Sequence, residues 1–234
     1  MEIIKMNPIE EKNNKEHYIR DWKEEIATIL GQHIYKQNSS MKKIQSMAHC
    51  LTDDVMNHDI RYNMCSEERE IDLYEHLIYT TILAIHVSEK IGLKKEEIYD
   101  IAFGCLIHDI GLRFNNAPYE NCDMDEMSPR QIYELKNHTI LGYTSLESED
   151  WIPRNVKSMV LSHHETLDGS GYPLKQKNTE VECRIIQVCD SVDRIISGIE
   201  GRKGTTENAI NEIYVYKGIK YDPIVVDVVL GIIA

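Results

Sequence analysis

Apolar residues recur at spacings of three and four along most of the chain, which is the pattern of helices with one buried face. Two such segments, 17–36 and 39–60, follow a polar start of about 16 residues that we expect to be disordered. A long helix is predicted over 66–93, with Ser66 as its N-cap, acidic residues in its first turn and Gly92 near its end. Strand-like alternation is scarce, so the sequence predicts an all-α fold.

Several shorter helices are predicted in the rest of the chain. One is nearly all apolar over 98–111 and ends at Gly111, and another over 128–146 has Ser128 as N-cap and Pro129 at its first position. The segments 151–165 and 183–199 and the stretch from Thr205 onward add three or four more, and 116–127 is the clearest irregular connection. A chain of 234 residues can bury one substantial core, so we expect a helical bundle with a short helical N-terminal extension.

Charge and cysteine usage narrow the function classes. Lys and Arg number 26 against 39 for Asp and Glu, a net charge of -13, which argues against binding to long nucleic acid. Binding of a small anionic substrate remains possible if metal cations hold it. The six cysteines form no CxxC pair, no secretion signal opens the chain, and no apolar stretch reaches the roughly 20 residues that span a bilayer. We therefore expect a cytoplasmic protein with reduced thiols and no membrane anchor.

Half of the ten histidines, together with two aspartates, fall on separate predicted helices or helix ends: His76, His108, Asp109, His138, His163, His164 and Asp190. Inward side chains from several helices of a bundle can converge on one pocket. Seven ligands are too many for one small ion, and Asp109 can bridge two cations through its two oxygens. Imidazole and carboxylate without thiolate favour iron or manganese over a closed zinc site. The remaining histidines are interpreted as ordinary core or surface residues: His17, His33, His49, His58 and His86.

Two motifs carry a resemblance to a known family. His108-Asp109-Ile110-Gly111 and His163-His164-Glu165-x-x-Asp168-Gly169-Ser170-Gly171-Tyr172-Pro173 resemble the two signatures of HD-GYP proteins, a branch of the HD metal-dependent phosphohydrolases. The resemblance runs from about Ser40 to the C-terminus, and we assign 66–234 to the HD-GYP domain and 1–65 to the extension. It implies metal binding by the seven residues above. Some members hold a third metal through a glutamate four residues before the first histidine, and here that position is Asp72.

The resemblance implies hydrolysis of a cyclic dinucleotide, chiefly cyclic di-GMP. Water that bridges two cations becomes hydroxide near neutral pH, so Asp109 is expected to hold the nucleophile between the metals. The expected substrate contacts are Gly171, Tyr172 and Pro173, with Arg113 and Arg202 as additional candidates. Tyr172 packs either on a base or on the bundle.

Two departures from the family pattern leave other functions open. Leu112 follows HDIG where hydrolytic members commonly have a lysine, and Ser197 to Arg202 keeps only the last arginine of the family's S-x-R-P-Y-R segment. Loss of general acid help costs roughly 100- to 10,000-fold, which predicts a slow enzyme. The alternatives are a catalytically degenerate regulator that binds metal and nucleotide, and a di-iron oxygenase on the same scaffold. Signal input is either absent or supplied by a partner protein, and the N-terminal helices either pack on the bundle or form a homodimer.

Overall fold

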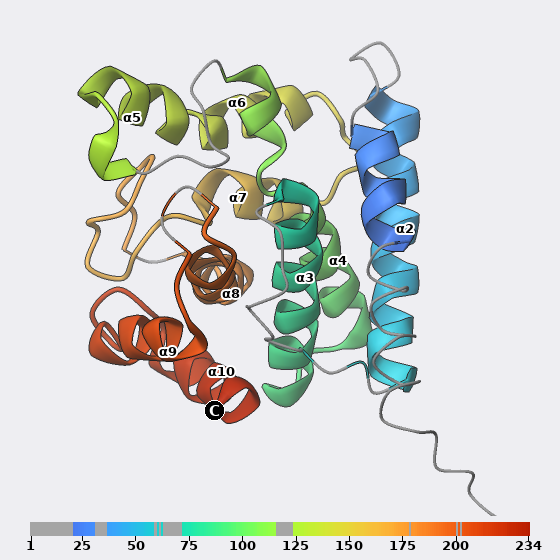
Figure 1. The fold of residues 1–234 in the computed structure, drawn as a ribbon. Helices are drawn as coiled ribbons and strands as arrows, with labels where there is room; N and C mark the ends of the chain where they lie inside the picture. The colour runs from blue at the N-terminus through green and yellow to red at the C-terminus, as the bar shows by residue number, and fades with distance from the viewer. Residues whose placement is uncertain are drawn as a thin grey trace, which may run out of the picture.

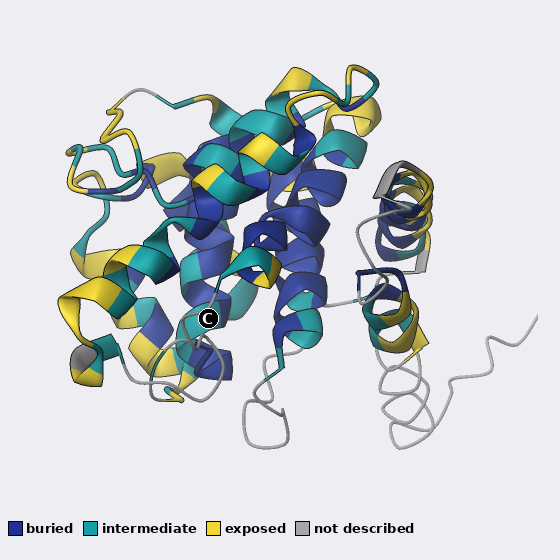
Figure 2. Cartoon of the chain, turned by 90° about the horizontal axis from the view of Figure 1, so that it is seen from above, coloured by how far each residue is buried: buried dark blue, intermediate teal, exposed yellow. Residues whose placement is uncertain are grey.

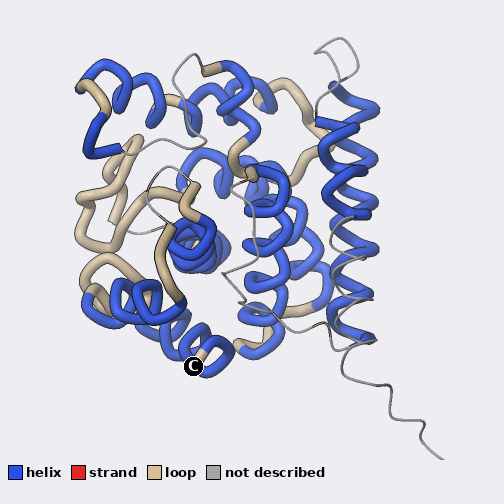
Figure 3. Tube along the Cα trace, in the orientation of Figure 1, coloured by secondary structure: helices blue, strands red, loops and turns tan. Residues whose placement is uncertain are grey.

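A computed structural model describes residues 21–30, 37–58, 60, 62, 72–115, 124–177, 179–199, 201 and 203–234. Its elements are a helix over residues 21–30, α2 (Gln37–His58), α3 (Leu73–Lys90), α4 (Lys95–Ile107), η2 (Ile110–Phe114), η3 (Met124–Glu126), α5 (Pro129–Lys136), α6 (His138–Leu146), α7 (Arg154–Ser162), α8 (Val181–Ser197), α9 (Thr206–Val215) and α10 (Pro223–Ile233). These residues contain no strand, as Figure 3 shows. They contain an isolated bridge between Lys217 and Tyr221. The predicted all-α class is confirmed.

The bundle is built around α3, which packs against α2, α4, α8 and α10. Its run of apolar residues, including Ile82, Leu83 and Ile85, is buried on nearly every side, as expected of a helix without a polar face. α7 packs against α4, α6 and α8, whereas α9 and α10 lie at the end opposite α5 and α6 (Figure 1). The central helices are mostly buried and the outer ones expose polar faces (Figure 2). α4 and α7 therefore both pack against α8, and α4 packs against α3 as well.

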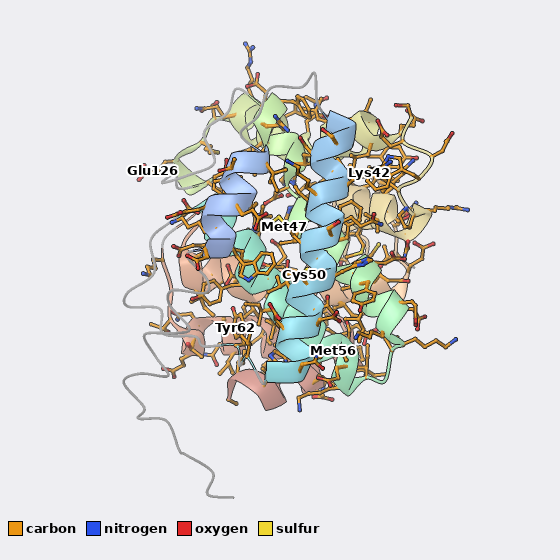
Figure 4. The ribbon with its side chains drawn as sticks, turned by 90° about the vertical axis from the view of Figure 1, so that its right-hand side faces the viewer. Lys42, Met47, Cys50, Met56, Tyr62 and Glu126 are labelled. Atoms are coloured by element: carbon orange, nitrogen blue, oxygen red, sulfur yellow. The ribbon has the colours of Figure 1, made fainter. Side chains whose placement is uncertain are left out.

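The described part of the N-terminal segment packs on the bundle. α2 buries Met41, Ile44, Ala48, Leu51 and Val55, a three-and-four spacing that gives one apolar stripe toward α3 and α4. Its other face is exposed, with Lys42 and Cys50 on the side shown in Figure 4. Of the two predicted roles of these helices, packing is the one that the structure shows. The division of domains at residue 65 stays a prediction, since residues 63–71 lie outside the described part.

Several helix boundaries differ from the sequence prediction. α3 begins at Leu73, because Asp72 has extended backbone and its carboxylate accepts the N–H of Glu75 as N-cap; Ser66 lies outside the described residues. α4 ends at Ile107, and the chain tightens into η2 instead of continuing to Gly111. The predicted helix over 128–146 is two helices that meet at Asn137. The Ser128 cap and Pro129 at the first position are confirmed. No helix in the described ranges has the length and apolar character to cross a bilayer.

Candidate metal centre

Three histidines are fixed by the same local contact. The ring Nδ1 of His108 donates to the carbonyl oxygen of Cys105 at 2.7 Å, that of His138 to Leu135 at 2.8 Å, and that of His163 to Val160 at 3.1 Å. Each carbonyl lies three residues earlier, in a last helical turn whose carbonyls have no partner within the helix. A carbonyl only accepts hydrogen bonds, so the neutral ring carries its proton on Nδ1. The Nε2 lone pair of each ring is therefore directed away from its own helix.

His76 on α3 is held by a carboxylate instead. Its Nδ1 lies 2.8 Å from Oδ2 of Asp193, and Oδ1 of Asp193 accepts the hydroxyl of Tyr62 at 3.0 Å. All three side chains are buried. An acidic partner on the far ring nitrogen fixes the orientation of a histidine and makes it a better donor to a cation.

Asp109 lies between two sets of histidines. Its Oδ1 is 3.1 Å from Nε2 of His138 and 3.5 Å from Nε2 of His163, and its Oδ2 is 3.3 Å from Nε2 of His108. Ligand atoms of two groups come within 4.8 Å of one another: Asp109, His138, His163 and His164 form one group, and His76, His108 and Asp109 form the other. Asp109 is common to both groups.

Asp190 on α8 closes the second group. Its Oδ1 lies 3.1 Å from Nε2 of His76 and 3.3 Å from Nε2 of His108. The structure thus brings together all seven residues that the sequence singled out. Asp193 was missed, although it lies three residues after Asp190 and so on the same buried face of α8.

The donor atoms of this centre suit a cation. Both oxygens of Asp109, Oδ1 of Asp190 and Nε2 of His164 are buried and have no hydrogen-bond partner among the described residues. Buried polar atoms without partners are rare, because each pays a desolvation cost. Pairs of Nε2 atoms also face each other, at 3.2 Å between His138 and His163 and 3.4 Å between His76 and His108. Cations would satisfy the carboxylate oxygens and the facing lone pairs together.

The protonation states point the same way. Burial raises carboxyl pKa values, but His108 holds the pKa of Asp109 well below its usual range, and Arg194 and His108 do the same for Asp190. Burial lowers the pKa of His163 to about 4, and burial also holds the pKa of His164 well below its usual value. Ionised carboxylates and neutral imidazoles are the forms that bind metal.

Two further histidines of the centre, His108 and His76, have pKa values shifted in the opposite direction. Burial alone would lower the pKa of His108, but Asp109 and Asp190 outweigh it and raise the value to about 10. Hydrogen bonds to Asp190 and Asp193 likewise outweigh burial and raise the pKa of His76. Metal binding at these two rings would displace protons.

The loop after His163 and His164 folds back onto them. The buried carboxylate of Glu165 accepts the N–H groups of Leu174 and Gln176, at 2.6 and 2.8 Å. Asp168 accepts the Thr166 hydroxyl and the N–H and hydroxyl of Ser170, which lowers its pKa to about 2. These contacts fix the loop before any ligand arrives.

Gly171 and Tyr172 occupy the inner side of this loop. A Cβ on Gly171 would overlap the carbonyl oxygen of His164, so glycine is needed for close packing within the loop. The ring of Tyr172 stacks on that of His164 with centroids 4.5 Å apart, and burial raises its pKa. Tyr172 was expected to pack either on a base or on the bundle, and the structure shows it packed on His164 of the bundle.

The remaining predicted site residues lie further out or outside the described part. Asp72 caps α3 and pairs with Lys23 at 3.5 Å, and neither group of close ligand atoms includes it. Arg113 is exposed on η2, where a small cavity of about 50 Å³ also reaches Asp109. Arg202 lies outside the described residues. Of the histidines interpreted as ordinary, His49 stacks on Tyr99 and His86 contacts the Ile60 carbonyl, whereas His17 and His33 and the side chain of His58 are not described.

The fold is an all-α bundle, and its buried histidines and aspartates form two groups of close ligand atoms. These features are those of a helical domain that binds metal. The family model described as HD domain matches residues 24–225. The chain belongs to the HD domain family. This match begins inside the segment that the sequence assigned to the extension, and it covers every described residue of the centre.

Proteins with related sequences agree with the family and with the expected resemblance to HD-GYP proteins. The chain is 30% identical over 172 residues to a cyclic di-GMP phosphodiesterase of Thermotoga maritima, covering 72% of this chain and 46% of that protein. It is 29% identical over 148 residues to the cyclic di-GMP phosphodiesterase response regulator RpfG of Xanthomonas campestris, covering 62% and 39%. The chain thus spans less than half the length of these relatives.

Solved structures share the fold. An HD-GYP-type protein of Bdellovibrio bacteriovorus, Bd1817, superposes with a TM-score of 0.62 at 18% identity and covers 95% of this chain and 80% of its own. A cyclic GMP-AMP specific phosphodiesterase of Vibrio cholerae superposes with a TM-score of 0.53 at 18% identity, over 80% of this chain and 48% of its own.

Proposed function

We propose that this protein is a metal-dependent phosphodiesterase that hydrolyses a cyclic dinucleotide, with cyclic di-GMP as the preferred substrate. The observation that carries the proposal is the position of Asp109, shared by two groups of close donor atoms. A shared carboxylate between two cations suits hydrolysis of a phosphodiester, where both the attacking and the leaving oxygen need charge stabilisation. The names of the sequence relatives support the substrate class.

Two divalent ions complete the proposed centre, with iron or manganese preferred for a donor set of imidazole and carboxylate. His76, His108 and Asp190 would hold one ion, His138, His163 and His164 the other, and Asp109 both. Such ions act as Lewis acids and lower the pKa of bound water toward neutrality. A third ion at Asp72 has less support, because the Asp72 carboxylate already caps α3 and pairs with Lys23.

The chain itself supplies orientation. Carbonyl oxygens of α4, α5 and α7 and the carboxylate of Asp193 hold four of the imidazole rings, so little rearrangement is needed when cations bind. Tyr172 covers His164, and the loop that ends in Gly171, Tyr172 and Pro173 forms the proposed substrate side. Arg113 and Arg202 are further proposed phosphate contacts. A cytoplasmic location is part of the proposal and fits the four described cysteines, which are all free thiols.

A regulator that binds without turnover is the second candidate, and Leu112 favours it. The Leu112 side chain is only 1% exposed and belongs to the core, so no group at this position can donate a proton to a leaving oxygen. A slow enzyme and a binding module share every other feature of the site.

Product analysis separates these functions. The protein is purified without oxygen, its metals are quantified by mass spectrometry, and it is incubated with cyclic di-GMP or cyclic GMP-AMP. Asp109→Ala is compared with Asp227→Ala, whose carboxylate is exposed and pairs with Lys217. If the parent protein and Asp227→Ala form linear dinucleotide and Asp109→Ala does not, the result supports phosphodiesterase activity. Bound metal and nucleotide without product favours the regulator, oxygen-dependent turnover favours the oxygenase, and absence of metal refutes the centre.

A further inference from the structure

The two oxygens of Asp190 face different surroundings. Oδ1 lies against His76 and His108, as described above, whereas Oδ2 is 3.8 Å from Nδ1 of His164 and 3.8 Å from Nε of Arg194. Arg194 follows Asp190 by one turn of α8, so the two side chains share a helix face. Arg194 thus lies beside the proposed metal ligand Asp190, next to Oδ2.

Apart from the small cavity that reaches Asp109 beside Arg113, the exposed surface of the ligand side chains lies on that same side. The side chains of His76, His108, His138 and His163 have no exposed surface, and those of Asp109 and Asp190 are 1% exposed. By contrast, His164 is 12% and Arg194 15% exposed. Tyr172, stacked on His164, is also partly exposed. Among the described ligand residues, His164 therefore forms the edge that a ligand meets from outside.

Two cationic side chains, Arg194 and Lys136, lie near this edge of a strongly acidic protein. Nζ of Lys136 lies 5.1 Å from the centre of the Tyr172 ring. The charge of Arg194 also acts on its surroundings, since it helps to lower the pKa of both Asp190 and His164. Because the net charge is -13, positive charge concentrated here favours an anion at this edge over other surfaces.

We propose that Arg194 binds a phosphate of the substrate at the exposed edge of the metal centre and supplies positive charge there. The inference rests on the proposed function. A guanidinium carries five donors in a planar fork, so it can stay near Asp190 and still contact phosphate oxygens. Arginine cannot readily release a proton, so its role is binding and charge stabilisation, with no part as a general acid.

A merely structural role would have Arg194 neutralise Asp190 and keep it in place for the metal. The two roles differ in what they change. Loss of a structural partner would lower the metal content, whereas loss of a phosphate contact would weaken anion binding at full metal content.

The test compares Arg194→Gln and Arg194→Lys with Arg184→Gln. Arg184 lies on the same helix but pairs with Asp222 at 2.6 Å, away from the centre. Metal content is measured first, and inorganic phosphate binding and the KM and kcat for cyclic di-GMP are then measured at equal metal content. Loss of one charge-assisted contact predicts a weakening of phosphate affinity and a rise in KM of about tenfold or more for Arg194→Gln. Arg194→Lys, which keeps the charge, should lie between it and the parent protein, and Arg184→Gln should match the parent.

Each outcome decides between the possibilities. Unchanged phosphate affinity and KM in Arg194→Gln, with or without loss of metal, overturns the inference and leaves the proposed function intact. If the protein shows no turnover but its phosphate affinity depends on Arg194, the inference is supported and the proposed phosphodiesterase activity is refuted. A parent protein that binds neither phosphate nor cyclic di-GMP refutes both. If Arg194→Gln does not fold, the same comparison is made with Arg194→Lys, whose parent-like phosphate affinity and KM would count against a forked contact.

Discussion

Oδ2 of Asp193 lies 2.8 Å from Nδ1 of His76, and both side chains are completely buried. This contact joins α8 to α3, the two central helices, at the depth of the metal centre. Asp190, three residues earlier on α8, faces the other nitrogen of the same ring at 3.1 Å. One helix therefore contacts both edges of His76, which orients the ring and sets its protonation.

Replacing Asp193 with alanine should weaken metal binding without removing a proposed ligand. Orienting partners of ligand histidines typically contribute roughly 10- to 100-fold to metal affinity, and we expect a loss in that range. Competition with a chelating dye measures the effect. Tyr62→Phe removes the hydroxyl that donates to Oδ1 of Asp193 and leaves the His76 contact in place, so it serves as the matched control, with near-parental affinity expected. Equal losses in the two variants would contradict a specific role for the His76 contact.

Metal stoichiometry should follow the two groups of donors. His138→Ala should lose about one ion per chain and keep the other, His76→Ala should do the same for the opposite group, and Asp109→Ala should lose both. Mass spectrometry after gel filtration gives the number of ions per chain. A protein that holds two ions in the absence of Asp109 would show that the shared carboxylate is not the bridge.

Leu112→Lys is expected to destabilise the fold and not to restore a hydrolytic group. The side chain of Leu112 packs in the core, and a buried ammonium without a partner should lower the free energy of unfolding by roughly 3 kcal/mol or more. Leu112→Met keeps the volume and should cost less than about 1.5 kcal/mol. Denaturant unfolding compares the two. A Leu112→Lys protein that is as stable as its parent and more active would place this side chain in the site.

Gly111→Ala should disturb the centre through the backbone. A Cβ at this position would overlap the carbonyl oxygen of His138 and come within 2.7 Å of the Gly142 nitrogen, so α6 and its histidine would have to move. We expect a loss of about 1–3 kcal/mol in the free energy of unfolding together with weaker metal binding. Gly231→Ala on α10 meets no atom within 4 Å and should leave both quantities near parental values. Similar behaviour of the two variants would argue against close packing of η2 on α6.

Sequence patterns predicted the helices and the convergence of their polar residues, because ligand-type side chains on several amphipathic helices have one common interior to face. They did not predict the break at Asn137, since the apolar spacing continues through it. Nor did they indicate the direction of Leu112, which depends on the tightening of the chain into η2 after His108. The spacing of Asp193 from Asp190 indicates a shared helix face, but the sequence of a helix does not show which residues Asp193 and Arg194 face across the bundle.

Acid should destabilise the metal-free protein in a defined pH range. An unfolded histidine has a pKa near 6.5, whereas burial lowers that of His163 to about 4 in the folded chain. Between these values the unfolded chain binds a proton that the folded chain excludes, so this stabilisation is complete above pH 6.5 and is lost as the pH falls toward 4. His164, whose pKa is also lowered, acts in the same direction. His76 and His108 have raised pKa values, so their contribution acts in the opposite direction as the pH falls through about 6.5, and it is constant below about pH 5.5, where both states are protonated.

Urea unfolding of chelator-treated protein at pH 7, 6 and 5 measures this dependence. The free energy of unfolding should fall by at most about 1.4 kcal/mol per pH unit for each of the two histidines. His163→Gln should show a shallower fall than the parent protein, whereas His49→Gln, on the exposed face of α2, should keep the parental slope. A slope that is the same in all three proteins would mean that His163 takes up its proton in the folded state as readily as in the unfolded one.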